Sequence, residues 1–338
     1  MPTSRAFAFT AALARVSAFF MFGLVVLGSV VRTTGSGLAC PDWPLCEGRV
    51  IPRLEPHVLI EWSHRTLALL ASLLVFGTAL SVMTRAAVRA RLGGLIGLAI
   101  TLLLAQVLLG ALTVWKLLSP ALVSSHLAAG LLLFVTMLTL ALRAQSHADD
   151  EAAAEALSVR PARGAPDPLG ATRTGAHVGD AVPPGALAPG LAAAFAAAAV
   201  LTYAQAILGG VVSSTHAVSA CPDWPTCQGQ WLPAMNGLVG LHMLHRYGGY
   251  LVALTVLLAW AAARQAPLGV RVGARLALTL VVAQVALGVC NVLLGAPAWV
   301  SAMHMATAAA LLAVLVVTTY RLVSAPAWGF RLVPAEAR

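Results

Sequence analysis

The chain has 338 residues, of which 59% are hydrophobic and only 10% are charged. This composition excludes a soluble globular protein, because so few polar residues cannot cover its surface, and it indicates an integral membrane protein. The net charge of +9 does not indicate a nucleic-acid partner, since the arginines lie in short blocks between apolar runs and form no single basic stripe.

Eight apolar runs are long enough to cross a bilayer, since a spanning helix needs about 20 residues. The first run is not interpreted as a signal peptide, because it is long and its end, Leu-Gly-Ser-Val-Val at 27–31, matches Leu-Gly-Gly-Val-Val at 208–212. The sequence therefore predicts an all-α integral membrane protein with eight transmembrane helices. They lie approximately at 10–32, 61–83, 92–115, 120–142, 187–212, 238–263, 272–295 and 300–322.

The placement of arginine predicts the orientation, because cytoplasmic loops are enriched in Lys and Arg. Arg5 and Arg331 flank the ends of the chain, and the loop at 213–237 carries no Lys or Arg at all. The segments after the second, fourth and sixth spans carry Arg85, Arg89, Arg91, Arg143, Arg160, Arg163, Arg173, Arg264 and Arg271. We expect a multi-pass protein of the cell membrane with both termini cytoplasmic.

Residues 144–186 differ from the segments on either side. Half of the twelve acidic residues fall here, among several Pro and Gly and without apolar periodicity. The composition predicts a flexible cytoplasmic linker, with a partner-docking segment as the less favoured alternative. This linker would join an N-terminal half, 1–143, to a C-terminal half, 187–338.

The two halves are copies of each other. Cys-Pro-Asp-Trp-Pro-Leu-Cys at 40–46 returns 181 residues later as Cys-Pro-Asp-Trp-Pro-Thr-Cys at 221–227. Ala-Gln-Val-Leu-Leu-Gly at 105–110 returns as Ala-Gln-Val-Ala-Leu-Gly at 283–288. Because each copy holds an even number of spans, both have the same orientation. The repeat predicts two pseudo-symmetric four-helix bundles related by an axis along the membrane normal.

Four cysteines form two pairs in loops that the charge rule places on the outer face. We expect the disulfides Cys40–Cys46 and Cys221–Cys227, because thiols oxidise outside the membrane. A zinc site is the rival interpretation, but each loop would need two more ligands. The spacing leaves open whether the disulfides only hold the loops or also exchange with an external dithiol.

Five of the nine histidines lie at the outer ends of even-numbered spans. They are His64, His126, His242, His245 and His304. One such histidine would be read as a packing residue, but equivalent residues reach the same depth twice in each half. Two imidazoles facing each other in a four-helix bundle are suited to bind a porphyrin iron from both sides. Without a Cys-x-x-Cys-His motif, such a heme would be held non-covalently.

Glu61 breaks the symmetry between the halves. It lies on the same helical face as His64, it is the only acidic residue in a predicted span, and the other copy has His242 in its place. An ionisable residue in a span is a functional-site candidate. The alternative is that Glu61 pairs with Arg65 or caps the helix. The asymmetry indicates that one half holds a cofactor and the other carries out chemistry.

The doubled Cys-Pro-Asp-Trp-Pro loops, the Glu-x-x-His-Arg sequence at 61–65 and the paired histidines resemble the heme A synthase family over nearly the whole chain. The resemblance implies oxidation of the C8 methyl group of heme O to a formyl group by successive hydroxylations. It implies that His64 and His126 flank the iron of heme O, with Glu61 as the catalytic acid or base. It also implies that His245 and His304 are the axial ligands of a heme B cofactor.

Arginines and glutamines near these histidines have further candidate roles. Arg65 and Arg246 are candidates to contact heme propionates, with a role as interfacial anchors as the alternative. Gln106 and Gln284 repeat in the third and seventh spans, where hydrogen bonding between helices explains them. The pathway implies heme O synthase as a partner, whereas the electron acceptor and any homo-oligomer stay open.

Two other classes of protein share part of this pattern. A bis-histidine membrane cytochrome that relays electrons would need the histidines but no acid in one copy alone. A transporter with parallel repeats would share the symmetry but would need neither matched histidines nor disulfide loops. The single acid, Glu61, favours an enzyme.

Overall fold

The computed structural model of the chain describes residues 2–158 and 189–324, and these residues are helical apart from short connections. Eight long helices are each long and apolar enough to cross a membrane, as the sequence predicts. They are α1 (Thr3–Thr33), α2 (Pro56–Met83), α3 (Ala86–Trp115), α4 (Pro120–Ser158), α5 (Pro189–Ser214), α6 (Gly237–Ala262), α7 (Leu268–Leu293) and α8 (Ala298–Val323). Three short 3₁₀ helices, η1 (Ser36–Leu38), η2 (Ala217–Ala220) and η3 (Ala263–Gln265), lie in the connections.

Proline and glycine define several helix boundaries. Pro56 is among the first residues of α2, and Pro267 and Pro297 are the residues before α7 and α8. Proline suits these places because its ring fixes φ and the first N–H groups of a helix have no intrahelical partner. Beyond the end of α1, Gly35 has a φ of +69°, a left-handed conformation that glycine adopts without steric cost.

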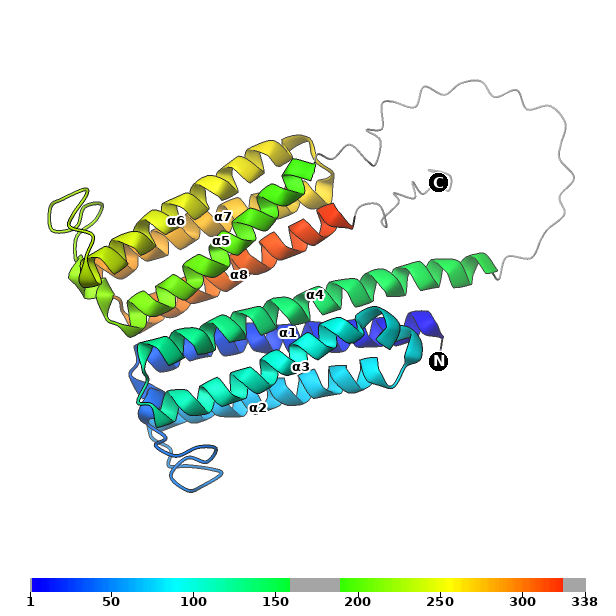
Figure 1. Cartoon of the computed structure of the whole chain (residues 1–338), viewed down its shortest axis with the longest axis horizontal. Coiled ribbons are helices and arrows are strands. Elements are labelled where there is room, and N and C mark those ends of the chain that lie inside the picture. Colours follow the sequence, from blue (N-terminus) through cyan, green and yellow to red (C-terminus); the bar gives the residue numbers. More distant parts are fainter. Residues whose placement is uncertain (1, 159–188, 325–338) are drawn as a thin grey trace, which may run out of the picture.

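The helices form two groups of four that lie side by side (Figure 1). In each group the helices pack in a ring in chain order, α1 to α4 in one and α5 to α8 in the other. The groups meet through α1 and α4 on one side and α5 and α8 on the other. Both cysteine loops lie at the same end of the molecule, opposite the N-terminus (Figure 1).

Each group has its own core, built largely from alanine and aliphatic side chains that let the helices approach closely. Phe7, Leu92 and Met137 are buried in the first core, and Phe195 and Leu315 are buried in the second. Many leucines on the outer faces are exposed in the protein alone, as expected for side chains that face lipid. The cores fix the helix positions on which the polar residues near the loops depend.

Helix α4 continues to Ser158, which differs from the prediction that a flexible linker begins at residue 144. Residues 144–158 are rich in Ala, the strongest helix former, and they lie against α1. The Ser4 hydroxyl donates to Glu155 Oε2 at 2.7 Å, and Arg15 donates to Gln145 Oε1 at 2.9 Å. Most of the remaining predicted linker, 159–186, lies outside the described residues.

Candidate functional site

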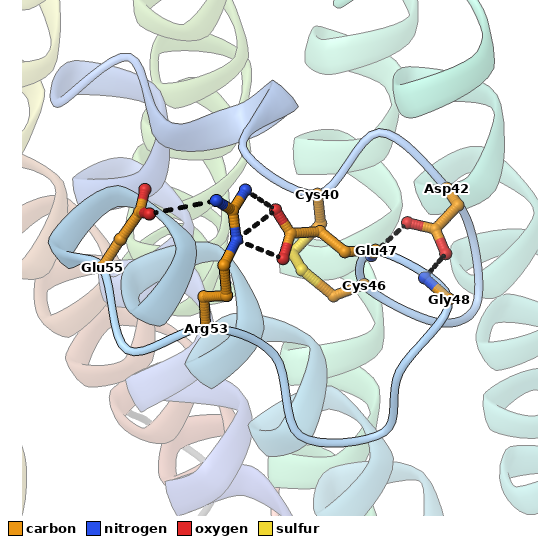
Figure 2. Close-up of polar contacts among 7 residues, drawn as sticks. All are labelled: Cys40, Asp42, Cys46, Glu47, Gly48, Arg53 and Glu55. Atoms are coloured by element: carbon orange, nitrogen blue, oxygen red, sulfur yellow. Dashed lines mark hydrogen bonds and ion pairs between the residues drawn. A yellow bond between two sulfur atoms is a disulfide. The ribbon is translucent and has the colours of Figure 1, made fainter.

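The structure contains both predicted disulfides, Cys40–Cys46 and Cys221–Cys227, in two loops of matching conformation. In the first loop, the Asp42 carboxylate accepts hydrogen bonds from the backbone N–H of Glu47 at 2.6 Å and of Gly48 at 2.8 Å (Figure 2). These bonds, led by the one from Gly48, lower the pKa of the Asp42 carboxyl. The aspartate of the Cys-Pro-Asp-Trp-Pro motif therefore folds the loop that the disulfide closes.

Asp223 has the same role in the second loop. Its carboxylate accepts from the backbone N–H of Gln228 at 2.7 Å and of Gly229 at 3.0 Å, and from the Thr226 hydroxyl at 2.7 Å. The Thr226 bond is the largest cause of the lowered pKa of the Asp223 carboxyl, followed by the two backbone bonds. Two loops with one hydrogen-bond pattern explain why the motif is repeated almost unchanged.

The outer rim of the first loop carries an exposed cluster of charges. Figure 2 shows the Arg53 guanidinium between the carboxylates of Glu47 and Glu55. Hydrogen bonding to Arg53 lowers the pKa of the Glu47 carboxyl. Ion pairs this exposed contribute little to stability because water and salt screen them. We assign them no part in the chemistry.

Arg65 links the first cysteine loop to Glu61. Its Nε donates to Glu61 Oε1 at 2.9 Å, an ion pair between residues one turn apart on α2. Its Nη1 donates to the carbonyl oxygens of Asp42 and Leu45 at 2.6 and 2.7 Å, and its Nη2 donates to that of Cys40 at 2.9 Å. The pairing of Glu61 with Arg65 is the arrangement that the sequence left as an alternative to a catalytic role.

Arg246 makes the corresponding contacts in the second half. Its Nη1 donates to the carbonyl oxygen of Thr226 at 2.9 Å and its Nη2 to that of Cys221 at 2.8 Å. Its Nε lies 3.3 Å from Nε2 of His242, the residue that corresponds to Glu61 in the repeat. The guanidinium groups of Arg65 and Arg246 thus already donate to carbonyl oxygens of the two loops. A heme propionate would compete with these carbonyls for either arginine.

The four histidines of the two predicted pairs share one environment. Each ring lies over a glycine of the preceding helix, so closely that an added methyl group would come within 2.9–3.3 Å of its Cε1 atom. The pairs are His64 with Gly28, His126 with Gly110, His245 with Gly209 and His304 with Gly288. Only glycine lets the backbone approach an imidazole this closely. The glycines therefore set the position of the rings.

Glutamines contact three of these four histidines. Nε2 of Gln106 lies 3.3 Å from Nε2 of His126, and Nε2 of Gln284 lies 3.1 Å from Nε2 of His304. Gln205 approaches His245 from the other side of the ring, with its Nε2 2.9 Å from Nδ1 and also bonded to the His245 carbonyl oxygen. Gln106 and Gln284 thus form hydrogen bonds between helices, as the sequence predicts, and their partners are the candidate ligand histidines.

A cavity of about 1270 Å³, counted with its open mouth, lies among the helices of the second group. The rings of His245 and His304 line it, with centroids 6.5 Å apart. His242 and Arg246 also reach the cavity, and Arg32 reaches it from α1 of the other group. The structure therefore brings together the histidines that the sequence pairs in this half, while His64 and His126 occupy the equivalent places on α2 and α4.

The glycines and Gln205 were missed by the sequence reasoning, although a signal for them exists. Leu-Gly occurs at the equivalent point of every odd-numbered helix, at 27–28, 109–110, 208–209 and 287–288. In α3, α5 and α7 it ends the longer pattern Ala-Gln-x-x-Leu-Gly, whereas α1 has Leu24 in place of the glutamine. A comparison of single helices, and not only of the two halves, would have shown that one unit occurs four times. The unit is an odd-numbered helix with Leu-Gly followed by an even-numbered helix with a histidine.

Comparison with known proteins agrees with this geometry. The family model for the COX15-CtaA cytochrome oxidase assembly protein matches residues 11–59 and 54–316. A heme A synthase of Symbiobacterium thermophilum is 30% identical over 267 residues, covering 78% of this chain and 79% of the relative. A heme A synthase of Halalkalibacterium halodurans is 29% identical, covering 83% and 87%.

A third relative differs in its name. A protoheme IX farnesyltransferase of Halobacterium salinarum is 32% identical over 137 residues, which cover 40% of this chain and 29% of that protein. The family match spans both halves and both cysteine loops. The chain belongs to the COX15-CtaA family of cytochrome oxidase assembly proteins, the family of the heme A synthases.

Proposed function

We propose that this protein is a heme A synthase that oxidises the C8 methyl group of heme O to a formyl group, giving heme A. The observation that carries the proposal is the single acid, Glu61, set one turn before His64. In the second half, glycines lie behind His245 and His304 in the same way, and Arg246 binds the carbonyl oxygens of its loop as Arg65 does. His242, however, stands in place of Glu61. A protein that only relayed electrons would have no use for this difference.

We assign the cofactor heme B to the second half, with His245 and His304 as axial ligands. Two imidazoles that bind one metal from opposite sides, with bonds of about 2 Å, have ring centroids on the order of 6 Å apart. The observed separation is 6.5 Å.

The first half would hold heme O between His64 and His126, whose rings rest on glycine in the same way. Removing hydrogen from an unactivated methyl group is electron chemistry that side chains cannot perform, and a heme iron supplies it. Glu61 would accept a proton near the reacting methyl group. Arg65 holds the Glu61 carboxylate at 2.9 Å, so it would fix the position of that acceptor.

The helix contacts support a pseudo-two-fold relation between the halves. If α1 to α4 correspond to α5 to α8, the two contacts between groups, α1 with α8 and α4 with α5, exchange with each other. The contact of α4 with α8 would then lie at the axis. We propose that this axis follows the membrane normal, with both termini cytoplasmic and both cysteine loops on the outer face. The halves 1–143 and 187–338 would thus be the substrate and cofactor halves.

The pathway implies further partners. Heme O is the product of farnesylation of heme B, so heme O synthase is the expected source of the substrate. It is consistent with this that a relative named protoheme IX farnesyltransferase aligns with the chain over 137 residues at 32% identity. Oxidation of a methyl group also releases electrons, so an electron acceptor is required, and no residue of the chain identifies it.

Heme analysis of the purified protein tests the proposal. The full-length chain is made in cells that supply heme O, and its hemes are extracted, separated and identified by mass. Heme B together with heme A or a hydroxylated intermediate supports the synthase. Heme B alone in both halves would favour a bis-histidine cytochrome that relays electrons, and no heme at all would overturn both.

Substitution of Glu61 tests whether its carboxylate is needed for heme A formation and not for the binding of heme B. Glu61→Gln keeps the shape of the side chain and a hydrogen-bond acceptor for Arg65 but removes the charge. We expect heme B to stay bound and heme A formation to be lost. The matched change in the other half, His242→Gln, should leave some formation of heme A. Unchanged product in the Glu61→Gln protein would remove Glu61 from the mechanism.

A further inference from the structure

Arg32 lies in the last turn of α1, in the first helix group, yet its side chain lines the cavity of the second group. The end of α1 is held against α8, where the Ser29 hydroxyl donates to the carbonyl oxygen of Ser301 at 3.5 Å. Ser301 lines the same cavity, one turn before His304. A cation from one half of the chain is therefore part of the wall of the site in the other half.

The Arg32 guanidinium lacks an anionic partner. Its Nη2 donates to the Ser29 hydroxyl at 3.4 Å, and its Nη1 is buried without any hydrogen-bond partner among the described residues. The ion pairs within residues 2–158 and 189–324 involve only Arg53 and Arg65. A buried cation without a counter-charge is costly, so such groups are normally paired. A ligand carboxylate in the cavity would provide the missing partner.

Arg246 also lines the cavity, but it cannot fill this role as easily. Two of its nitrogens already donate to the loop carbonyls of Thr226 and Cys221. The first half has no equivalent of the free guanidinium, because the residue that corresponds to Arg32 in the repeat is Ser213. The unpaired cation thus marks the cavity of His245 and His304.

We propose that Arg32 binds a carboxylate of the ligand that fills this cavity, so that the first half of the chain completes the site in the second half. The inference rests on the proposed function, under which the ligand is heme B and the carboxylate is one of its propionates. A guanidinium matches a carboxylate with two parallel hydrogen bonds, which makes it the suitable residue type. The phosphate of a lipid head group is the other source of an anion at this place.

Redox titration of the full-length protein tests the assignment. The variants are Arg32→Gln and Arg32→Lys, with Arg15→Gln as the matched control, since Arg15 lies on the same helix and its side chain donates to Gln145, away from the cavity. A positive charge near a heme favours its reduced form, so Arg32→Gln should lower the midpoint potential of the resident heme. It should also weaken heme retention by roughly tenfold to a hundredfold. Arg32→Lys should restore part of both, and Arg15→Gln should match the parent protein.

Heme dimethyl ester, which has no free carboxylate, identifies the source of the anion. It is added to the full-length protein made under heme limitation, and its binding is compared with that of heme B. The parent protein should prefer heme B, and Arg32→Gln should lose most of that preference. Equal preference in the two proteins would assign Arg32 to another anion, such as a lipid phosphate, and would overturn the proposal.

The outcomes also separate this inference from the proposed function. If the parent protein binds no heme at this site, both fall. If it binds heme and the Arg32→Gln protein keeps the same potential and heme content, only the role of Arg32 falls. If Arg32→Gln does not fold, the Arg32→Lys protein decides, because a reduced preference for heme B over its ester supports the contact and an unchanged preference opposes it.

Discussion

Arg65 joins Glu61 to the loop closed by the Cys40–Cys46 disulfide. The guanidinium donates to Glu61 Oε1 at 2.9 Å and to the carbonyl oxygen of Cys40 at the same distance. Glu61 is only 5% exposed, so its charge depends on this contact. Arg65 therefore binds both the cysteine loop outside the helices and Glu61 within α2.

Replacement of Arg65 should disturb both the Cys40–Cys46 loop and Glu61. Arg65→Gln leaves the Glu61 carboxylate buried without a counter-charge, and breaking a buried ion pair costs about 3 kcal/mol or more. We expect a lower unfolding temperature, a loop that is more easily reduced, and loss of heme A formation. Thermal unfolding, thiol labelling and product analysis measure these effects.

Arg246→Gln is the matched control. It removes the same clamp from the second loop, where the partner on the helix is His242 instead of an acid. The second loop should loosen, but no carboxylate loses its charge partner, so the fall in unfolding temperature should be smaller. Equal losses from the two substitutions would mean that the clamp matters only for the loops and not for Glu61.

Much of this arrangement could be predicted from the sequence. Hydropathy predicts all eight membrane helices because each must be apolar over its length, and the exact repeat of the cysteine motif predicts both disulfides. The histidines stand out because ionisable groups in a span are rare. The glycines behind them do not stand out, since small residues are common wherever membrane helices meet.

Other features depend on the third dimension. The extension of α4 to Ser158 is stabilised by contacts with α1, such as Ser4 with Glu155, that no local pattern predicts. Nothing in the sequence singles out Arg32, the last residue of a predicted span. Only the packing of α1 against α8 places it in the cavity of the other half.

Alanine in place of the glycine behind His245 should displace the ring. The added methyl group of Gly209→Ala would lie 2.9 Å from Cε1 of the imidazole, which is too close to tolerate. We expect heme binding in the second half to weaken by about 10- to 100-fold, the usual cost of disturbing the support of a metal ligand. The heme-to-protein ratio, measured by absorption, reports the loss.

A glycine on the same helix provides the control. A methyl group added at Gly190 meets no atom within 4 Å, so Gly190→Ala should keep full heme content. Gly110→Ala and Gly97→Ala form the equivalent pair on α3, where only the former approaches an imidazole. A loss of heme in both members of either pair would point to a general effect on the helix and not to the ring.

Because of Asp42 and Asp223, the stability of the two cysteine loops should depend on pH only in the acidic range. Their folded pKa values lie below the ordinary value of 3.8, so the stabilisation is complete above that pH and is lost as the pH falls through the lowered pKa. Asp223→Asn removes the charge at every pH. We expect its Cys221–Cys227 disulfide to be reduced faster than in the parent protein, with an excess that is constant from about pH 8 to pH 5.

The excess should begin to shrink once the pH falls below the ordinary value of 3.8, and it should be lost as the pH falls through the lowered pKa of Asp223. The rate of thiol labelling after a fixed exposure to a phosphine reductant measures it. An excess that disappeared already near pH 5 would mean that the hydrogen bonds to Asp223 do not hold its carboxyl in the charged form.

Gln205 distinguishes the surroundings of His245 from those of His64, its counterpart in the first half. It contacts Nδ1 of His245 at 2.9 Å, whereas the equivalent place behind His64 is occupied by Leu24. Gln205→Leu would give His245 the surroundings of His64. A ligand whose second ring nitrogen loses its hydrogen bond is oriented less firmly and binds metal about 10- to 100-fold more weakly.

The reverse change, Leu24→Gln, would give His64 a partner for Nδ1, which is buried without one among the described residues. We expect the first variant to lose heme B from the second half and the second variant to hold heme in the first half more tightly. Tighter binding there should slow release of heme A, so that product stays on the protein during purification. Heme extraction from the two variants measures both effects, and unchanged heme contents would show that the glutamine only joins α5 to α6.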